Sequence, residues 1–427
     1  MAEYVEIEKT PITKRLSYTF FFLSCAVFLC LSLICFFSEL IGIEKIISTD
    51  IVFLVSAVLG LLGSSLALFN ALIERKITIK KEYLKQNFEI GFLVFAIFWS
   101  FLATIFAIKQ DIVWLGNTYN KEGFLSILGY GAIAISAYNI KSKDRKKLLK
   151  LFILASTIPA TYLLFVNIFS IKTPISPTRS IYRNSNHYGY ALCVLVVLSA
   201  CFITYEKKWW QRLLYSCTFT ILHANLLVTD CFGAHVGELA GLGVLIIIRL
   251  IEERKLKYTI LLIVGLLAVS TTILEITKIT NITDDYATLF KDIGGIASGG
   301  ATGNEGSSRF ELWGETLTII AQVPFFGKGL DCYYNNNVIM KIDMPHNEYL
   351  QIASNVGIPV LLCYLAFLVV VYTKAIRGRK ELKNTQKIAL IGGVSYLVSA
   401  LFGNTFLYTY PILIIMVAFG LKRRKIC

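Results

Sequence analysis

The sequence has little charge. Charged residues make up only 16% of its 427 positions and hydrophobic residues 56%, whereas a soluble globular protein carries about 25% charged residues. This composition excludes a soluble enzyme. The ten cysteines have no paired metal-ligand spacing, and most lie inside apolar runs, where cysteine behaves as a small hydrophobic residue. The sequence therefore supports neither a zinc site nor a disulfide framework.

Long apolar runs are what the sequence has in abundance. A transmembrane helix needs about 20 mainly apolar residues, so these runs predict an all-α, polytopic membrane helix bundle with about 12 transmembrane helices. The first run follows basic residues, as a signal peptide does, but it is too long and has no small-residue cleavage pattern. We interpret it as a retained helix. The expected spans are Leu16–Phe37, Ile51–Ile73, Ile90–Ile108, Gly123–Ile140, Leu151–Ser170, Tyr188–Tyr205, Leu213–Val228, Ala234–Leu250, Tyr258–Leu274, Tyr349–Tyr372, Ile388–Phe402 and Pro411–Leu421.

The net charge of +14 suits either a nucleic-acid-binding protein or a membrane protein whose basic loops set its topology. Most of the 42 Lys and Arg residues fall in the two termini and in alternate loops. Cytoplasmic loops carry such an excess, so membrane insertion explains the charge and both termini are expected in the cytoplasm. All four histidines and more than half of the 28 acidic residues fall in the outward half. Any chemistry should therefore face outward, and no nucleic-acid partner is expected.

One outward connection is much longer than the others and divides the chain into three regions. Residues 1–274 hold the first nine predicted spans, residues 275–346 form a large extracytoplasmic loop, and residues 347–427 hold the last three spans. Loops of that length are usually functional or disordered. The first part of this loop, Asn281–Ser308, is rich in glycine and suits a flexible flap.

The second part of the loop predicts an amphipathic helix that begins near Arg309. Ser308 and Glu311 have the spacing of a capping box. Arg309 falls in the first turn, where a cation opposes the helix dipole by about 0.3–1 kcal/mol. A residue placed against that preference could have an anionic partner, and a solvated or headgroup-contacting arginine is the equal alternative. The residues at helical spacing before Pro324 are Phe310, Trp313, Leu317 and Ile320.

His346 lies where the long loop meets the tenth predicted span, at an expected helix N-terminus. The helix dipole there disfavours an imidazolium, which keeps a neutral ring able to accept a proton, and free backbone N–H groups nearby suit a phosphate. An isolated interfacial histidine is more often structural, but sharing a segment with Arg309 favours a catalytic role. Glu348 is an acidic neighbour that could act as a base or orient the histidine.

Two other outward turns carry polar residues. Arg179 and Arg183 could clamp a diphosphate with their guanidinium groups, or could anchor the following helix at the interface. Asp230, His235 and Glu238 lie between the seventh and eighth spans, and ionisable groups inside a membrane are costly and usually functional. They could equally pair with one another as a structural cluster.

Several strings of residues resemble a known family. They are Ser308-Arg309-Phe310-Glu311-Leu312-Trp313, then Pro324 with Gly327 and Gly329, then His346-Asn347 with Tyr349-Leu350-Gln351 and Gly357, and Arg179 followed by Asn184-Ser185-Asn186 and Gly189. These strings resemble the O-antigen ligase and O-antigen (capsular polysaccharide) polymerase family of bacterial membrane glycosyltransferases. The resemblance covers the C-terminal half of the chain, and the first four spans match only in hydropathy.

The resemblance implies an enzyme of the bacterial plasma membrane with its active site on the extracytoplasmic face. Such an enzyme takes an oligosaccharide from an undecaprenyl-diphosphate carrier and joins it to lipid A core or to a growing polymer. Arg309 corresponds to the family's essential loop arginine and His346 to its essential histidine. The family often has Ser-Arg-Gly-Ala between two middle spans, whereas this chain has Cys231-Phe232-Gly233-Ala234. The missing arginine shifts the expected diphosphate binding toward Arg179 and Arg183.

We therefore expect an inverting, metal-independent glycosyltransferase without a cofactor, which acts on a lipid-linked oligosaccharide and a glycan acceptor within the lipid bilayer. Arginines can neutralise the leaving diphosphate, and the sequence offers no convincing metal ligands. The missing arginine favours a surface polysaccharide polymerase over a ligase that acts on lipid A core. The expected catalytic residues are His346, Arg309 and Glu348. The expected substrate-binding residues are Arg179, Arg183, Asn184, Asn186, His235 and Glu238.

A transporter or flippase of the lipid-linked glycan is the alternative from another functional class. Twelve spans with cytoplasmic termini fit a secondary transporter, which is expected to show two equal halves and often a long central cytoplasmic link. Here the central link, Glu206–Arg212, is short, and the long connection is outward and late in the chain. This arrangement favours the enzyme.

Overall fold

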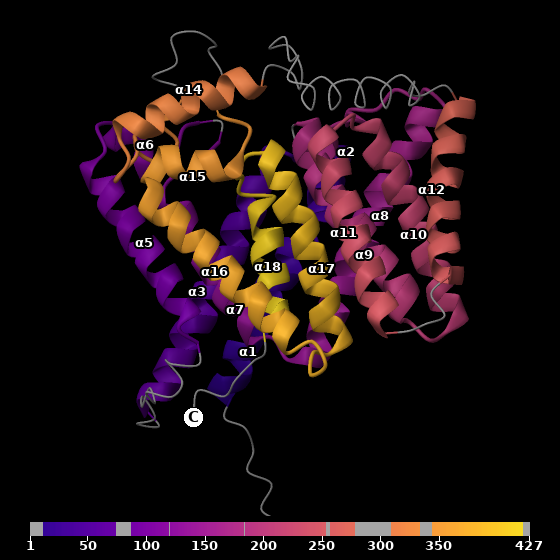
Figure 1. The fold of residues 1–427 in the computed structure, drawn as a ribbon, viewed down its shortest axis with the longest axis horizontal. Helices are drawn as coiled ribbons and strands as arrows, with labels where there is room; N and C mark the ends of the chain where they lie inside the picture. Colours follow the sequence, from indigo (N-terminus) through magenta and orange to yellow (C-terminus); the bar gives the residue numbers. More distant parts are fainter. Residues whose placement is uncertain are drawn as a thin grey trace, which may run out of the picture.

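The computed structural model describes residues 12–73, 87–118, 120–182, 184–252, 257–277, 309–333 and 344–421. Over these residues the protein is a helical bundle without strands (Figure 1). The helices are α1 (Ile12–Leu29), α2 (Leu31–Leu40), α3 (Thr49–Ile73), α5 (Glu89–Phe106), α6 (Gln110–Val113), α7 (Phe124–Asn139), α8 (Ser142–Ile168), η1 (Ser180–Tyr182), α9 (Ser185–Tyr205), α10 (Trp209–Val228), α11 (Phe232–Glu252), α12 (Lys257–Thr277), α14 (Arg309–Gln322), α15 (Glu348–Val356), α16 (Ile358–Arg377), α17 (Asn384–Ser399), η3 (Ala400–Phe402) and α18 (Tyr410–Gly420).

Apolar side chains cover the outside of this bundle. Leu54 on α3, Phe98 on α5 and Leu261 on α12 are 54%, 55% and 65% exposed, respectively. Such a surface is unfavourable in water but suits contact with lipid chains. Nine helices of the described residues are long and apolar enough to cross a membrane. The protein is thus the polytopic all-α membrane protein that the sequence predicts, while twelve crossings and cytoplasmic termini stay predictions.

The centre of the bundle is α9, which is buried among α10, α11 and α17. Its neighbour α11 approaches α17 closely because Gly237 carries no side chain: a Cβ there would lie 2.5 Å from the Ser395 carbonyl oxygen. At one end of the bundle Arg145 on α8 donates from Nη1 to the carbonyl oxygens of Phe419 and Leu421, both at 2.8 Å. This buried guanidinium satisfies carbonyls that the end of α18 leaves without a helical partner.

Two predicted spans are each divided into two helices. The span expected at Leu16–Phe37 is interrupted at Cys30, between α1 and α2, and the one expected at Tyr349–Tyr372 is interrupted at Gly357, between α15 and α16. Hydropathy could not indicate the first break, because the residues on both sides remain apolar. At the second break, Gln351, Ser354 and Asn355 before Gly357 were a polar signal that the prediction did not use. The other predicted spans each coincide with one α-helix, although the span Ile388–Phe402 also includes the short helix η3 and α8 begins at Ser142, well before the expected start at Leu151.

Gly357 produces the break between α15 and α16. Its φ angle of +93° is one that residues with a side chain rarely adopt, and a Cβ there would lie 2.0 Å from the Phe325 carbonyl oxygen. The turn that follows α14, residues 324–329, is therefore packed directly against this break. Three backbone hydrogen bonds join the two segments: Lys328 N to Ser354 O (2.8 Å), Gly329 N to Asn355 O (3.0 Å) and Ile358 N to Pro324 O (2.8 Å).

Replacing Gly357 with alanine should destabilise the folded protein by more than about 2 kcal/mol, because the new Cβ adds both backbone strain and a steric overlap. Thermal unfolding of the protein in detergent measures the effect as a fall in Tm. Gly265→Ala on α12 is the matched control, since nothing lies within 4 Å of a Cβ built there. Equal Tm values for the two variants would contradict the packing described for Gly357.

Helices α14 and α15 lie across the end of the bundle that is at the top of Figure 1, and we call this the loop end. The amphipathic helix predicted from Arg309 onward is confirmed as α14, which ends at Gln322 before Pro324. Its buried face differs from the predicted one, because Leu312 is 1% exposed and Leu317 is 56% exposed. The predicted flap, Asn281–Ser308, lies outside the described residues.

Candidate functional site

Arg309 and His346 belong to two segments that are joined at the loop end. Arg309 begins α14, and His346 precedes α15 by two residues. Trp313, one turn after Arg309, donates its Nε1–H to the carbonyl oxygen of Pro345 at 3.0 Å. Burial and the positive charge of Arg309 lower the pKa of His346 from 6.5 to about 4. The imidazole is therefore neutral at physiological pH, mainly because it is buried.

The backbone at His346 is unusual. Its φ angle is +50°, in the left-handed region that non-glycine residues seldom occupy. Asn347 follows in an extended conformation and caps α15, with its side-chain oxygen accepting from Tyr349 N and Leu350 N at 3.1 Å each. Two of the N–H groups that the sequence suggested for phosphate are thus already occupied.

A segment near the end of the described chain lies against His346. We call residues 403–409, which connect η3 to α18, the strap. Asn404 Nδ2 lies 3.2 Å from His346 Nδ1, and the Thr405 backbone N–H donates to Gln351 Oε1 at 2.8 Å. Tyr408 OH lies 2.9 Å from His187 Nδ1 on α9. The strap therefore contacts both His346 and His187, which are far apart in the sequence.

The sequence analysis did not predict the contacts that the strap makes with His346, Gln351 and His187. Asn404 and Thr405 interrupt two apolar runs, and this polar pair was the one available signal. His187 stands beside the predicted Asn186, but its contact with Tyr408 joins residues that are far apart in the sequence. Phe402, just before the strap, packs against Trp313 of α14 with ring centroids 6.2 Å apart. The strap and the helix η3 before it thus together contact both segments of the site.

Glu348 is 1% exposed and lies in a separate polar cluster. Its Oε1 accepts from Tyr364 OH at 3.1 Å and its Oε2 accepts from Tyr396 OH at 3.4 Å. Burial raises the pKa of Glu348 from 4.5 to about 8, although the tyrosine hydrogen bonds oppose this change. The carboxyl group is therefore protonated at neutral pH and is bound to tyrosines of α16 and α17.

The match to a known family covers the segments that carry Arg309 and His346. Residues 216–365 match the family model described as O-antigen ligase. This part of the chain is similar to the O-antigen ligase family. No curated protein matches the chain. This match and the apolar helices together support a multi-pass membrane enzyme of the O-antigen ligase and polymerase type, which transfers glycosyl groups. His187 and the strap lie outside the matched residues.

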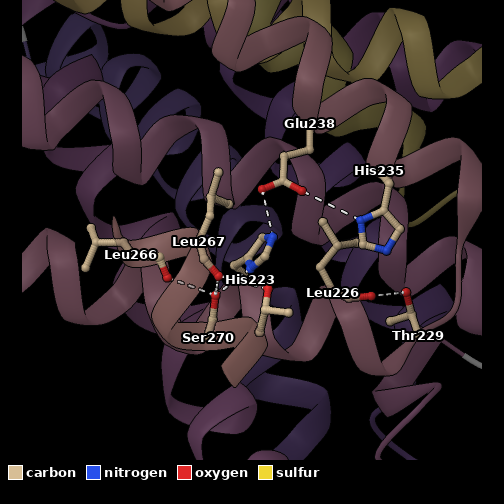
Figure 2. Close-up of polar contacts among 9 residues, drawn as sticks. His223, Leu226, Thr229, His235, Glu238, Leu266, Leu267 and Ser270 are labelled. Carbon is tan, nitrogen blue, oxygen red and sulfur yellow. Dashed lines mark hydrogen bonds and ion pairs between the residues drawn. The ribbon is translucent and has the colours of Figure 1, made fainter. Parts of the chain in front are cut away.

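The matched residues also include His235 and Glu238, which the sequence left as binding residues or as a structural pair. Glu238, 2% exposed, lies between two imidazoles: its Oε2 is 3.7 Å from His235 Nδ1, and its Oε1 is 3.5 Å from His223 Nε2. His223 Nδ1 lies 2.7 Å from Ser270 Oγ on α12. Figure 2 shows the carboxylate between the two rings. These residues pair with one another and connect α10, α11 and α12.

The predicted site residues that precede the matched range have simpler surroundings. Asn184 caps α9, with its side-chain oxygen accepting from Asn186 N at 2.8 Å. Asn186 is half-buried, and Arg179 is exposed on the turn before η1. Arg183 lies outside the described residues. In the described part of the chain, no group of three or more His, Cys, Asp or Glu side chains could hold a metal ion.

A second buried carboxyl group makes the pH dependence of stability measurable. Glu122, before α7, accepts from Tyr130 OH at 2.6 Å, and burial raises its pKa from 4.5 to about 8. Glu122 and Glu348 therefore keep their protons in the folded protein at pH values where the unfolded chain has lost them. Between pH 4.5 and about pH 8 these two carboxyl groups bind more protons in the folded state, so their contribution to stability falls as the pH rises. Below pH 6.5 the lowered pKa of His346 acts in the opposite direction.

We expect the Tm of the detergent-solubilised protein to fall between about pH 7 and pH 8, above the range in which the lowered pKa of His346 opposes the two carboxyl groups, with each raised pKa unit worth about 1.4 kcal/mol. Glu348→Gln keeps a neutral group of the same shape and should flatten this decline. Glu311→Gln, at an exposed position on α14, is the matched control and should leave the decline unchanged. A wild-type Tm that does not change over this range would contradict the protonated state of both carboxyl groups.

Proposed function

We propose that the protein moves an oligosaccharide from an undecaprenyl-diphosphate carrier to a glycan acceptor at the extracytoplasmic face of the bacterial plasma membrane. The observation that carries the proposal is the junction of the two site segments, where Trp313 bonds Pro345 and the charge of Arg309 acts on His346. This junction supplies a cation and a neutral base together, within segments that match the O-antigen ligase family model.

In the proposed reaction the arginines and the histidine have separate tasks. Arg309, aided by Arg179 and Arg183, neutralises the diphosphate as the bond between the anomeric carbon and the phosphate oxygen breaks. His346 takes the proton of the acceptor hydroxyl while its oxygen forms the new bond to that carbon. Attack on the face opposite the leaving group inverts the anomeric centre. The lipid diphosphate leaves with the electron pair of the broken bond.

Glu348 has a supporting task in this proposal. Both of its carboxyl oxygens accept hydrogen bonds from tyrosines, and its pKa of about 8 leaves it protonated. A protonated acid bound in this way cannot take the acceptor proton, so we assign it to holding α15 in place. We assign His235 and Glu238 to joining helices, because they contact each other and His223.

A polymerase and a ligase of this type differ in the acceptor that they use. We favour a surface polysaccharide polymerase, which uses a second lipid-linked glycan as acceptor, because the arginine of the Ser-Arg-Gly-Ala turn is missing at Cys231–Ala234. A ligase that uses lipid A core is the alternative. Purified protein in liposomes should be given an undecaprenyl-diphosphate repeat unit, alone and with lipid A core. A ladder from the repeat unit alone identifies a polymerase, and one product that requires core identifies a ligase.

The same assay tests the remaining parts of the proposal. Because arginines supply the positive charge, activity should be unchanged by EDTA, and loss that added Mg²⁺ restores would contradict metal independence. Proton NMR of the product should show that the new linkage has the configuration opposite to that of the donor. Movement of the lipid-linked glycan across the membrane without any new glycosidic bond would identify a flippase instead.

A further inference from the structure

Asn404 has a buried side-chain amide in which the nitrogen has a hydrogen-bond partner and the oxygen does not. The residue is 4% exposed, and its Nδ2 lies 3.2 Å from His346 Nδ1. Its Oδ1 is buried and has no hydrogen-bond partner among the described residues. A buried carbonyl oxygen without a partner is unfavourable and rare in folded proteins. Its position beside the histidine of the site suggests that the oxygen has a partner at another stage of the reaction.

The hydrogen bond of Asn404 decides which imidazole nitrogen of His346 carries the proton. When Nδ2 donates to Nδ1, the neutral ring holds its proton on Nε2 and has no free lone pair. A rotation of the amide by 180° exchanges its two ends at nearly the same place. Oδ1 then accepts from a protonated Nδ1, and the lone pair of Nε2 becomes free to take a proton.

We propose that Asn404 is a positioning residue that sets the tautomer of His346 by rotation of its amide. This inference rests on the proposed function, in which His346 is the base. In the resting orientation, Nε2–H is a donor toward the acceptor hydroxyl. In the rotated orientation, Nε2 takes the acceptor proton and the resulting imidazolium donates Nδ1–H to Oδ1. The oxygen without a partner in the resting state thus stabilises the charged ring that the reaction produces.

Asn404 is a neutral side chain beside His346, whereas the other side chains that act on the ring are charged or titratable. Arg309 of α14 and His187 of α9 are the charged or titratable side chains of the described residues whose electrostatic interaction with His346 is resolved. A second cation beside the ring would oppose protonation, and an amide oxygen favours it without adding a charge. Asn404 also belongs to the strap, which the Thr405 backbone bond to Gln351 fixes in place.

The test compares three variants of full-length protein in liposomes with the lipid-linked repeat unit as substrate. Asn404→Ala should lower kcat by about 100-fold, because neither tautomer is then selected, and should change KM for the donor lipid less than about twofold. Asn404→Asp accepts from Nδ1–H in every state, so it should retain more activity than Asn404→Ala. Its acidic limb in the pH profile of kcat/KM should move to higher pH, because the carboxylate favours the imidazolium.

Thr405→Val is the matched control. Its Oγ1 is also buried without a hydrogen-bond partner among the described residues, it lies on the same strap, and valine has nearly the same shape. Its kcat should equal that of the wild type. An Asn404→Ala variant with normal kcat, or one that raises only KM, overturns the proposal. If that variant does not fold, the pH profile of Asn404→Asp decides, and an unshifted acidic limb overturns it.

Failure of this inference and failure of the proposed function give different results. If the wild type forms no glycosidic bond with any donor, the proposed function is wrong. If the wild type is active and His346 variants are inactive while Asn404→Ala is normal, only the role of Asn404 is wrong.

Discussion

Replacing His346 with asparagine should lower kcat for glycosyl transfer by about 100- to 10,000-fold, the range that general-base catalysis contributes. Asparagine removes the imidazole but is one of the few side chains that tolerate a positive φ, so the backbone at φ +50° should be kept. KM for the donor lipid should change little, because the arginines and not the histidine bind the diphosphate. Initial rates in liposomes at saturating donor measure the effect.

The matched control for this variant is Ser170→Asn. Ser170 also has a φ angle of +50° and is exposed on the turn after α8, so asparagine there tests the backbone alone. We expect wild-type activity from the control. A His346→Asn variant that keeps more than about a tenth of the wild-type kcat would remove His346 from the proton-accepting role.

The pKa of His346 adds a second signature. At a value of about 4, the ring stays neutral well below the ordinary histidine range. The acidic limb of the kcat/KM profile, which reports the free enzyme, should therefore lie near pH 4. The limb in kcat should lie higher, because a bound diphosphate adds negative charge near the ring and favours the imidazolium. A kcat/KM limb near pH 6.5 would place the base elsewhere.

Arg309→Gln should lower kcat/KM by about 100- to 1,000-fold, as does the loss of a group that stabilises developing negative charge. Arg309→Lys should lose less, because it keeps the charge but not the two parallel hydrogen bonds that a guanidinium donates to a phosphate. The two variants should also separate in pH dependence. Removing the charge raises the pKa of His346, so the acidic limb of kcat/KM should move to higher pH in Arg309→Gln and stay in place in Arg309→Lys.

The control for Arg309 is Arg212→Gln, which removes a guanidinium from an exposed position at the start of α10. It should have wild-type kcat/KM and an unshifted profile. A loss of activity in Arg309→Gln without any shift of the acidic limb would mean that the arginine does not act on His346, even if it binds substrate.

The sequence predicts the parts of this fold that depend on local pattern. Apolar runs predict the long helices, and helical spacing after Arg309 predicts α14. The division at Gly357 was missed, because it depends on the turn of residues 324–329 packing against that position. The prediction of the buried face of α14 was wrong at Leu317 for the same reason, because residue spacing indicates an apolar face but not which part of it packs against the rest of the protein.

The candidate site could be proposed from the sequence only where one residue type is informative by itself. Arg309 in a helix first turn and His346 before a span are unusual placements that a sequence shows. Asn404 contacts His346 across 58 positions, and His223 contacts Glu238 from another helix, so neither pairing leaves a local signal. Glu348 stands next to His346 in the sequence, but its place on α15 brings its carboxyl group to Tyr364 and Tyr396 instead.

The strap has a consequence for how the enzyme matures during translation. During translation, Arg309 and His346 are inserted before Asn404, so the nascent chain contains the arginine and the histidine while the strap that contacts His346 has not yet been synthesised. The strap lies between α17 and α18, so it is positioned only when these two helices pack into the bundle. At its other end, α18 is held by the hydrogen bonds from Arg145 to its last carbonyl groups. On the roles proposed above, we expect the newly inserted protein to have little activity until this final hairpin docks and the bundle is complete.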